Sequence, residues 1–138
     1  MKRKLPPRRS NCPIACALDL VGDRWTLIVL RDLIMGRKRH FQELLACNEG
    51  IATNILASRL KLLEAAGLAT RRADPPQARR VVYAPTEKAL DLLPVLVELI
   101  RWSLKYSAGS AVPAQFARRL SADREAFIAD LRAAHARG

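Results

Sequence analysis

One segment, residues 50–83, restricts the fold of this chain more than any other. Leucines recur in it at spacings of four and three, which predicts an α-helix over residues 52–66 with one apolar face: Leu56, Leu60 and Leu63. Gly67 is expected to end this helix, because glycine adopts the left-handed conformation of a helix terminus without a steric penalty. Two short arginine-containing segments then flank residues 74–78, Asp-Pro-Pro-Gln-Ala, which predicts a β-hairpin with a Pro-Pro tip.

Three shorter helices are predicted before this segment, over residues 13–20, 24–35 and 41–46. Pro13 suits the start of the first, because the N–H that proline lacks would be unpaired there anyway. Asp23 is expected to cap the second with its carboxylate. Short helix, turn, longer helix and hairpin follow one another in the order of a winged helix-turn-helix. We therefore expect a mainly α fold with a small β-hairpin wing.

A long helix is predicted after the hairpin, over residues 86–107. Its apolar residues cover most of the circumference, which indicates burial on more than one side and, in a small domain, a partner subunit. Pro94 is expected to kink this helix, because it has no backbone N–H for the carbonyl of Leu90. Beyond a linker, a last amphipathic helix is expected over residues 116–138, with Ser121 as its cap.

These expectations divide the chain into three parts. Residues 1–11 form a basic arm with five Lys and Arg and no acid, which we expect to be disordered. The arm serves either solubility or contact with a nucleic-acid backbone. Residues 12–107 form the winged helix-turn-helix domain with its dimerisation helices, and residues 108–138 form the linker and the C-terminal amphipathic helix.

The net charge of the chain indicates which classes of partner it binds. The 138 residues carry 24 Lys and Arg against 13 Asp and Glu, a net charge of +11. This balance indicates a polyanionic partner, most often nucleic acid, with a membrane surface as the alternative. No run reaches the roughly 18 apolar residues of a spanning helix. The three cysteines follow no disulfide framework, so we expect a soluble, cytoplasmic protein with reduced thiols and no membrane partner.

Signatures of catalysis are missing from the sequence. It has no phosphate-binding loop, dinucleotide glycine pattern, nucleophile elbow or pair of catalytic acids, so we expect neither an enzyme nor a cofactor. A thiol enzyme based on Cys12 would lack a base, since His40 and His135 are distant in sequence. The cysteines and histidines also show no zinc spacing, which argues against a metal site.

Three motifs, within residues 12–102, carry a family resemblance: CPIACALDLVGDRWTLIVLRDLIMGRKRHFQEL, GIATNILASRLKLLEAAGLATR and RRVVYAPTEKALDLLPVLVELIRW. Together they resemble the HxlR-type branch of the MarR-like winged-helix transcriptional regulators. The resemblance implies a homodimer on a palindromic operator, each subunit placing one recognition helix in a major groove. It also implies dimer contacts from the first helix and the long helix: Ile14, Leu18, Leu96, Ile100 and Trp102. Pro85 replaces a typical leucine, so the last strand is expected to end early.

Candidate DNA contacts follow from the predicted helix-turn-helix. Four small or hydrogen-bonding side chains share the polar face of the recognition helix: Thr53, Asn54, Ser58 and Lys61. Asparagine can pair with adenine in a bidentate way, and Ser and Thr bond either base edges or phosphates. The alternative is an ordinary solvated face. Arg59 lies nearer the buried edge and could pair with an acid of the core.

The wing and the connector before the helix-turn-helix supply the candidate phosphate contacts. Each strand of the hairpin brings two arginines: Arg71 and Arg72, then Arg79 and Arg80. Neighbours along a strand face opposite ways, so about half of them can point at DNA. We favour Arg79 and Arg80, the nearest to the tip, with Arg72 as a further candidate. Arg39, with Arg37 and Lys38, precedes the first helix of the motif and is expected to hold the backbone on the other side.

Cys12 is a candidate redox sensor, with Cys16 one turn further on the same face. A helix N-terminus and nearby arginines favour a thiolate at Cys12. The alternative is that both cysteines are small residues packed near a dimer interface, and Cys47 is expected in the core. The leading function is thus a dimeric transcriptional regulator, switched by an oxidant or a small molecule. The alternative is an architectural nucleic-acid-binding protein that recognises charge and not sequence.

Overall fold

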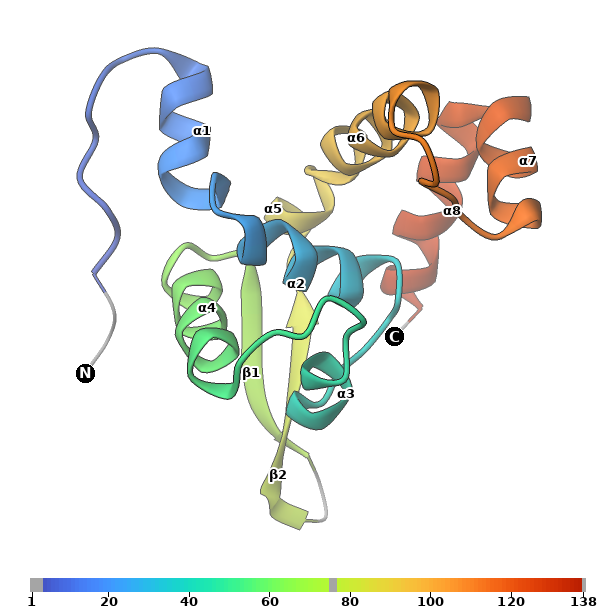
Figure 1. Cartoon of the computed structure of the whole chain (residues 1–138). Helices are drawn as coiled ribbons and strands as arrows, with labels where there is room; N and C mark the ends of the chain where they lie inside the picture. Colours follow the sequence, from blue (N-terminus) through green and yellow to red (C-terminus); the bar gives the residue numbers. More distant parts are fainter. Residues whose placement is uncertain (1–3, 75–76, 138) are drawn as a thin grey trace. The chain divides into compact units, whose positions relative to one another are not determined.

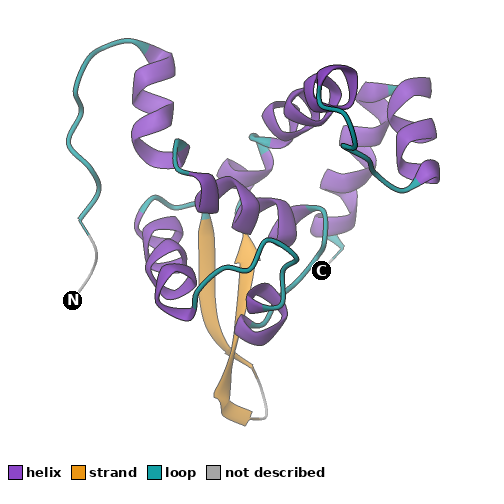
Figure 2. Cartoon of the chain, in the orientation of Figure 1, coloured by secondary structure: helices purple, strands orange, loops and turns teal. Residues whose placement is uncertain are grey.

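The computed structural model describes residues 4–74 and 77–137, apart from the side chains of residues 77–79. The chain divides into two compact units, Met1–Ala89 and Leu90–Gly138, and each is described by itself. Figure 1 traces the elements along the chain, and Figure 2 separates the helices from the two strands. The described elements are mostly helical, with one antiparallel hairpin, as the sequence predicts.

The first unit begins with four helices, whose bounds are α1 (Pro13–Val21), α2 (Arg24–Ile34), α3 (Phe41–Leu45) and α4 (Thr53–Ala65). Pro13 stands in the first turn of α1. Asp23 caps α2, because its Oδ1 accepts hydrogen bonds from the backbone N–H groups of Trp25 and Thr26, both at 3.0 Å. Gly67 follows α4 with a φ of +73°. The predicted cap of α2 and the left-handed turn after α4 are therefore confirmed.

The hairpin pairs β1 (Ala69–Asp74) with β2 (Gln77–Pro85). Ala69 pairs with Pro85 at its base, and the register shifts between Ala73 and Asp74. The expected early end of the last strand is wrong: Pro85 is its final residue, where a missing N–H leaves the ladder intact. The predicted tip residues Pro75 and Pro76 lie outside the described residues.

Figure 1 shows α2, α3 and α4 gathered around the base of the hairpin. α2 contacts α4 and β2, and α4 also packs on β1. The core of this unit is mainly apolar, and its largest fully buried apolar side chains come from the three helices: Leu30, Leu33, Ile34, Leu44, Leu56, Leu60 and Leu63. The α4 leucines among them are those whose spacing predicts the helix. Burial of one leucine side chain contributes about 2 kcal/mol, so this shared core holds α4 firmly in place.

The long helix predicted after the hairpin is two helices, and the expectation of one kinked helix is wrong. α5 (Glu87–Leu90) ends at the boundary of the two units, and α6 (Leu93–Tyr106) begins after a turn at residues 91–92. Pro94 lies in the first turn of α6. Proline cannot donate to a carbonyl of the preceding turn but costs nothing at a helix start, so the chain breaks the helix there instead of bending it.

The single C-terminal helix predicted over residues 116–138 is likewise two helices, α7 (Ala114–Ala122) and α8 (Arg124–Ala136). Ser121 is not the cap. Asp123 caps α8 through a 3.0 Å bond from the backbone N–H of Ala126 to its Oδ1. The negative charge of the Asp123 carboxylate also interacts favourably with the positive, N-terminal end of the α8 dipole. The backbone of Asp123 is extended, and this ends α7.

The second unit joins α6, α7 and α8 by apolar and ionic contacts. Phe116 of α7 and Phe127 of α8 meet edge to face, with ring centroids 4.6 Å apart. Arg124 Nε lies 2.6 Å from Glu98 Oε1 and Arg132 Nη1 lies 3.0 Å from Asp91 Oδ1, so α8 is tied to α6 and to the turn before it. Leu120, Phe127 and Ile128 are buried.

Candidate nucleic-acid interface

The exposed face of α4 carries the predicted base-reading residues. Thr53, Asn54 and Lys61 are exposed, and Ser58 is half-buried. No carboxylate occurs between residues 53 and 61 of this helix. Ala52 at the N-cap offers no side-chain acceptor, so the first backbone N–H groups of α4 are open to a phosphate oxygen. This face can donate and accept hydrogen bonds without repelling DNA.

The strand register decides which wing arginines share a face. Arg72 pairs with Val82 and shares its face of the ribbon, whereas Arg80 lies in the irregular stretch of β2 between the pairs Ala73–Val81 and Asp74–Gln77. Arg71 pairs with Tyr83 on the other face. Arg72 and Arg80 are exposed. The side chain of Arg79, the other favoured candidate, lies outside the described residues.

A chain of polar contacts links the wing to the start of α3. Arg80 Nε lies 3.9 Å from Asp74 Oδ2, and the same oxygen lies 3.3 Å from His40 Nε2. His40 Nδ1 lies 2.7 Å from Glu43 Oε1. The hydrogen bond to the His40 side chain is the main reason that the pKa of Glu43 is lowered. The wing is therefore linked to the first helix of the helix-turn-helix from near its tip.

The connector arginine has a structural role that the sequence does not reveal. Arg39 Nη1 donates to the backbone carbonyls of Leu33 and Lys38, both at 2.9 Å. Burial, then the nearby charge of Arg37, lowers the pKa of Arg39. Its carbonyl oxygen accepts from the N–H of Tyr83 at 2.7 Å. Arg39 thus joins the end of α2 to β2, and its contact with DNA stays a prediction.

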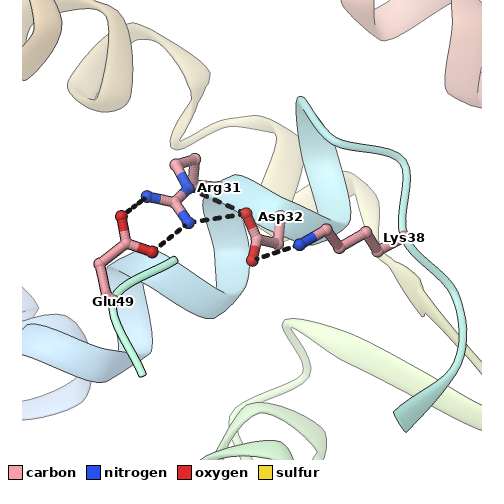
Figure 3. Close-up of polar contacts among 4 residues, drawn as sticks. All are labelled: Arg31, Asp32, Lys38 and Glu49. Atoms are coloured by element: carbon pink, nitrogen blue, oxygen red, sulfur yellow. Dashed lines mark hydrogen bonds and ion pairs between the residues drawn. The ribbon is translucent and has the colours of Figure 1, made fainter. Parts of the chain in front are cut away.

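A cluster of four charged side chains fixes the turn before α4 (Figure 3). Arg31 Nη1 and Nη2 donate to the two oxygens of Glu49 at 2.8 and 2.9 Å, a bidentate pair. Arg31 also binds Asp32 at 2.9 Å, and Lys38 Nζ lies 3.2 Å from the other Asp32 oxygen. The hydrogen bonds from Arg31 lower the pKa of Glu49 to about 2.

Glu49 precedes Gly50, whose φ of +73° turns the chain, and the buried Ile51, after which α4 begins. The Arg31–Glu49 pair therefore sets where the recognition helix starts relative to α2. Sequence reasoning missed this pair because its members are 18 residues apart and follow no periodic pattern. In the sequence, this pair is indicated only by charged residues that stand within otherwise apolar segments.

Arg59 of α4 is tied to α2, as the sequence suggested for an arginine near the buried edge. Its Nε lies 2.9 Å from Asp23 Oδ1. Burial works to raise the pKa of Asp23, but the net effect is a pKa below its usual value. It is lowered by hydrogen bonds from the Thr26 side chain and backbone, by the Arg59 charge and by the N–H of Trp25. One carboxylate thus caps α2 and anchors the recognition helix.

The cysteines lie where the sequence places them. Cys12 is exposed at the N-cap of α1, Cys16 is half-buried and Cys47 is buried in the first unit. Ser10 contacts both thiol residues: its Oγ accepts from the N–H of Cys12 at 3.1 Å, and its carbonyl accepts from Cys16 Sγ at 3.3 Å. Arg9 Nε lies 3.8 Å from Asp19 Oδ1, so the arm is held along α1 beside the cysteines.

The residues predicted for a dimer interface differ in their exposure. Ile14 and Leu18 of α1 are 72% and 55% exposed, and Trp102 of α6 is 63% exposed. Ile100 is half-buried. Leu96 is covered within its own chain, with 6% exposure, so it offers little surface to a partner. Val95 and Leu99, which the sequence-based set omits, are exposed on α6.

Within residues 4–74 and 77–137, no helix combines the length and apolar character needed to cross a membrane. The same residues contain no group of three or more His, Cys, Asp or Glu that could hold a metal ion.

Comparisons with known proteins agree with this geometry. A family of HxlR-like helix-turn-helix proteins matches residues 20–110. The HTH-type transcriptional regulator Mb3122 of Mycobacterium bovis is 41% identical over 90 residues, which cover 65% of this chain and 56% of that protein. The chain thus spans little more than half of the length of this relative.

Two solved structures extend the likeness. The reduced form of the transcriptional regulator YodB of B. subtilis has a TM-score of 0.58 and 28% identity, covering 74% of this chain and 100% of the other. The redox regulator HypR in its oxidised form has a TM-score of 0.61 and 27% identity, covering 68% of this chain and 96% of the other. With its winged helix-turn-helix and a match over residues 20–110, the chain belongs to the HxlR-like helix-turn-helix family of MarR-like transcriptional regulators.

Proposed function

We propose that this regulator binds a palindromic DNA operator as a homodimer and recognises its sequence through α4. One observation carries the proposal: an exposed face without carboxylates, bearing Thr53, Asn54 and Lys61, lies in the same unit as a basic wing. The net charge of +11 supports a polyanionic partner.

α4 would enter the major groove, which is about 12 Å wide and admits one helix. Asn54 suits a bidentate pair with adenine, whereas Thr53, Ser58 and Lys61 suit base edges or phosphates. Arg72 and Arg80, both exposed on the wing, would hold phosphates or enter the minor groove, together with Arg79. The Arg31–Glu49 pair would keep α4 at the angle that this docking needs.

The homodimer rests on exposed apolar side chains. Ile14 and Leu18 on α1, and Val95, Leu99 and Trp102 on α6, are each at least 45% exposed. Large apolar side chains of this kind on a small domain favour a partner subunit. A two-fold dimer would present two recognition helices at a spacing of about 34 Å, one turn of DNA.

The test compares two variants on operator DNA and on random DNA of equal length. Asn54→Ala should weaken operator binding by about 1–3 kcal/mol and leave random DNA nearly unchanged, because a bidentate base contact is lost. Arg80→Gln should weaken both and lower the salt slope by about 0.9, because one phosphate contact is lost. Gln115→Ala, an exposed polar residue of α7, serves as the matched control.

Equal losses for Asn54→Ala on operator and random DNA would remove this residue from base recognition. Footprinting separates the proposal from its alternative, an architectural protein that binds any sequence. A protected palindrome supports the regulator, and uniform coverage supports the architectural protein.

A second proposal concerns the signal: oxidation of Cys12 lowers operator affinity. Cys12 is exposed at the N-cap of α1, where a soluble oxidant can reach it, and the likeness to the redox regulator HypR supports the same role. Hydrogen peroxide would oxidise the thiol to a sulfenic acid and be reduced to water. Condensation with a second thiol, that of Cys16 or of a partner subunit, would then form a disulfide and release another water.

The oxidised group would add polar bulk beside Ile14, on the face expected in the dimer interface. Operator affinity is measured before and after mild peroxide, in the wild type and in Cys12→Ser. The wild type should lose affinity and Cys12→Ser should retain it. An equal loss in both proteins would place the oxidised residue elsewhere, and no loss in the wild type would reject the switch.

A further inference from the structure

The second unit contains a pocket that the DNA-binding surface does not use. Its volume is about 580 Å³, and its walls come from α6, α7 and the start of α8. Small-molecule sites typically occupy about 300–1,000 Å³, so the space suits a small ligand and excludes a macromolecule. We propose that this pocket binds a small organic anion, a carboxylate attached to a compact apolar body.

The apolar part of the ligand has a matching surface. Leu104 of α6 lies across from Ala117 and Leu120 of α7, and Leu120 is 5% exposed. Ala117, Leu120 and Ser121 recur at spacings of three and four, so they share one face of α7. These side chains form an apolar floor, and the Ser121 hydroxyl stands at its edge as a donor.

The carboxylate has three cationic partners around this floor. Arg101 and Lys105, four residues apart, share one face of α6, and Arg124 opens α8. Like charges at this spacing repel each other, and an anion between them would relieve the repulsion. Arginine offers a carboxylate two parallel N–H donors, and lysine offers a further charged donor.

The existing ion pairs leave one positive charge unbalanced at the rim. Glu98 Oε1 lies 2.6 Å from Arg124 Nε and 3.5 Å from Arg101 Nη1, and Glu125 also pairs with Arg124. Lys105 Nζ lies 5.1 Å from the centre of the Tyr106 ring, and among the described residues no carboxylate pairs with it. Three cations thus meet two carboxylates, and one bound carboxylate would balance the group.

The experiment measures ligand binding to the full chain without DNA, by calorimetry and by amide shifts in two-dimensional NMR. The probe is 4-phenylbutyrate, with its neutral amide and with acetate as comparisons. The carboxylate should bind and shift the amide signals of Leu104, Ala117 and Ser121. The amide lacks the charge and acetate lacks the apolar body, so both should bind at least about tenfold more weakly.

Lys105→Gln and Arg101→Gln should each weaken the probe about tenfold, the loss expected for one charge-assisted hydrogen bond. Arg118→Gln removes the same charge from an exposed position of α7 outside the pocket, and should bind as the wild type does. Circular dichroism checks that all variants fold.

Three results would overturn the proposal: no binding of the probe, equal binding of its amide, or an equal loss in Arg118→Gln. In those cases the three cationic side chains have only a structural role, in the ion pairs with Glu98 and at the end of α6. Because DNA is absent from the assay, this outcome leaves the proposed operator binding untouched, and a failure of operator binding leaves the pocket untouched.

Discussion

At the scale of single residues, carboxylates and arginines position the recognition helix. Arg31 reaches Glu49 in the turn before α4, and Asp23 reaches Arg59 within α4. Both pairs start from α2, one from each end of that helix. Thr53, Asn54 and Lys61, which we propose as base-reading side chains, are exposed. The proposed DNA contacts would therefore depend on pairs that are not themselves proposed to touch DNA.

The Glu49 contact should make stability depend on pH. Its pKa is about 2 in the folded chain, against an ordinary 4.5. The folded value is depressed, so the stabilisation is fully present above about pH 4.5 and is lost as the pH falls toward 2. Because Glu49 and Arg31 are both more than one-third exposed, we expect Glu49→Gln to cost only about 0.5–1 kcal/mol at pH 7.

Thermal unfolding of the wild type and Glu49→Gln is compared at several pH values. The gap in melting temperature should be a few degrees at pH 7 and should close in strong acid. Glu64→Gln, on α4, is the matched control and should show no such closing gap. A gap that persists unchanged in strong acid would contradict the assigned role of the Glu49 carboxylate.

A second prediction at this scale concerns Asp23. Asp23→Ala removes the cap of α2 and the partner of Arg59, so it should cost about 1–2 kcal/mol, the range of N-cap losses, measured by urea unfolding. Arg59→Gln keeps the cap and removes only the ion pair, so it should cost less. Equal losses in both variants would show that the cap contributes nothing.

At the scale of elements, the C-terminal region shows how caps divide a helical sequence. Residues 114–136 have continuous helical character, yet the extended backbone of Asp123 separates α7 from α8. Its carboxylate caps the second helix, and Ser121, the residue that the sequence favours, does not. The pocket of the second unit lies at this break, since Ser121 near the end of α7 and Arg124 at the start of α8 both line it.

Asp123→Ala should therefore lower the helicity and stability of the second unit, with a loss of about 1 kcal/mol for one N-cap. Ser121→Ala should leave both unchanged. Circular dichroism at increasing urea measures the two quantities. A larger loss for Ser121→Ala than for Asp123→Ala would restore the sequence-based assignment of the cap.

At the scale of the whole molecule, the proposed homodimer rests on exposed apolar side chains of both units. The rings of Trp102 and Tyr106 are tilted by 51° with centroids 5.7 Å apart, and Trp102 remains 63% exposed. Burying one such side chain contributes about 2–3 kcal/mol. A regulator of palindromic sites needs this association, because a single subunit contacts only half of the site.

Sedimentation at micromolar concentration should give about twice the chain mass of 15.4 kDa. Trp102→Glu and Ile14→Glu should each shift the protein toward the monomer, because a charge cannot be buried without a partner. Arg118→Glu alters an exposed charge on α7 and should leave the mass unchanged. A wild type that stays monomeric and soluble would reject the homodimer.

The sequence by itself determined the elements of the winged helix-turn-helix. Leu56, Leu60 and Leu63 predicted α4, Gly67 predicted its end, and Asp23 predicted the cap of α2. These features depend on contacts within one helical turn, so neighbouring residues encode them. The exposure of Thr53, Asn54 and Lys61 also follows from this periodicity, since the opposite face is buried.

Only the tertiary structure decided the contacts between elements. His40 and Asp74 are 34 residues apart, and Arg31 and Glu49 are 18 apart, so packing of the helices and the hairpin sets their distances. The register shift beside Arg80 is also seen only in the structure, because a single sequence does not specify the strand register. The charges that gather around the pocket of α6, α7 and α8 meet for the same reason: distance in space depends on how the elements pack, whereas local patterns depend on neighbours in the chain.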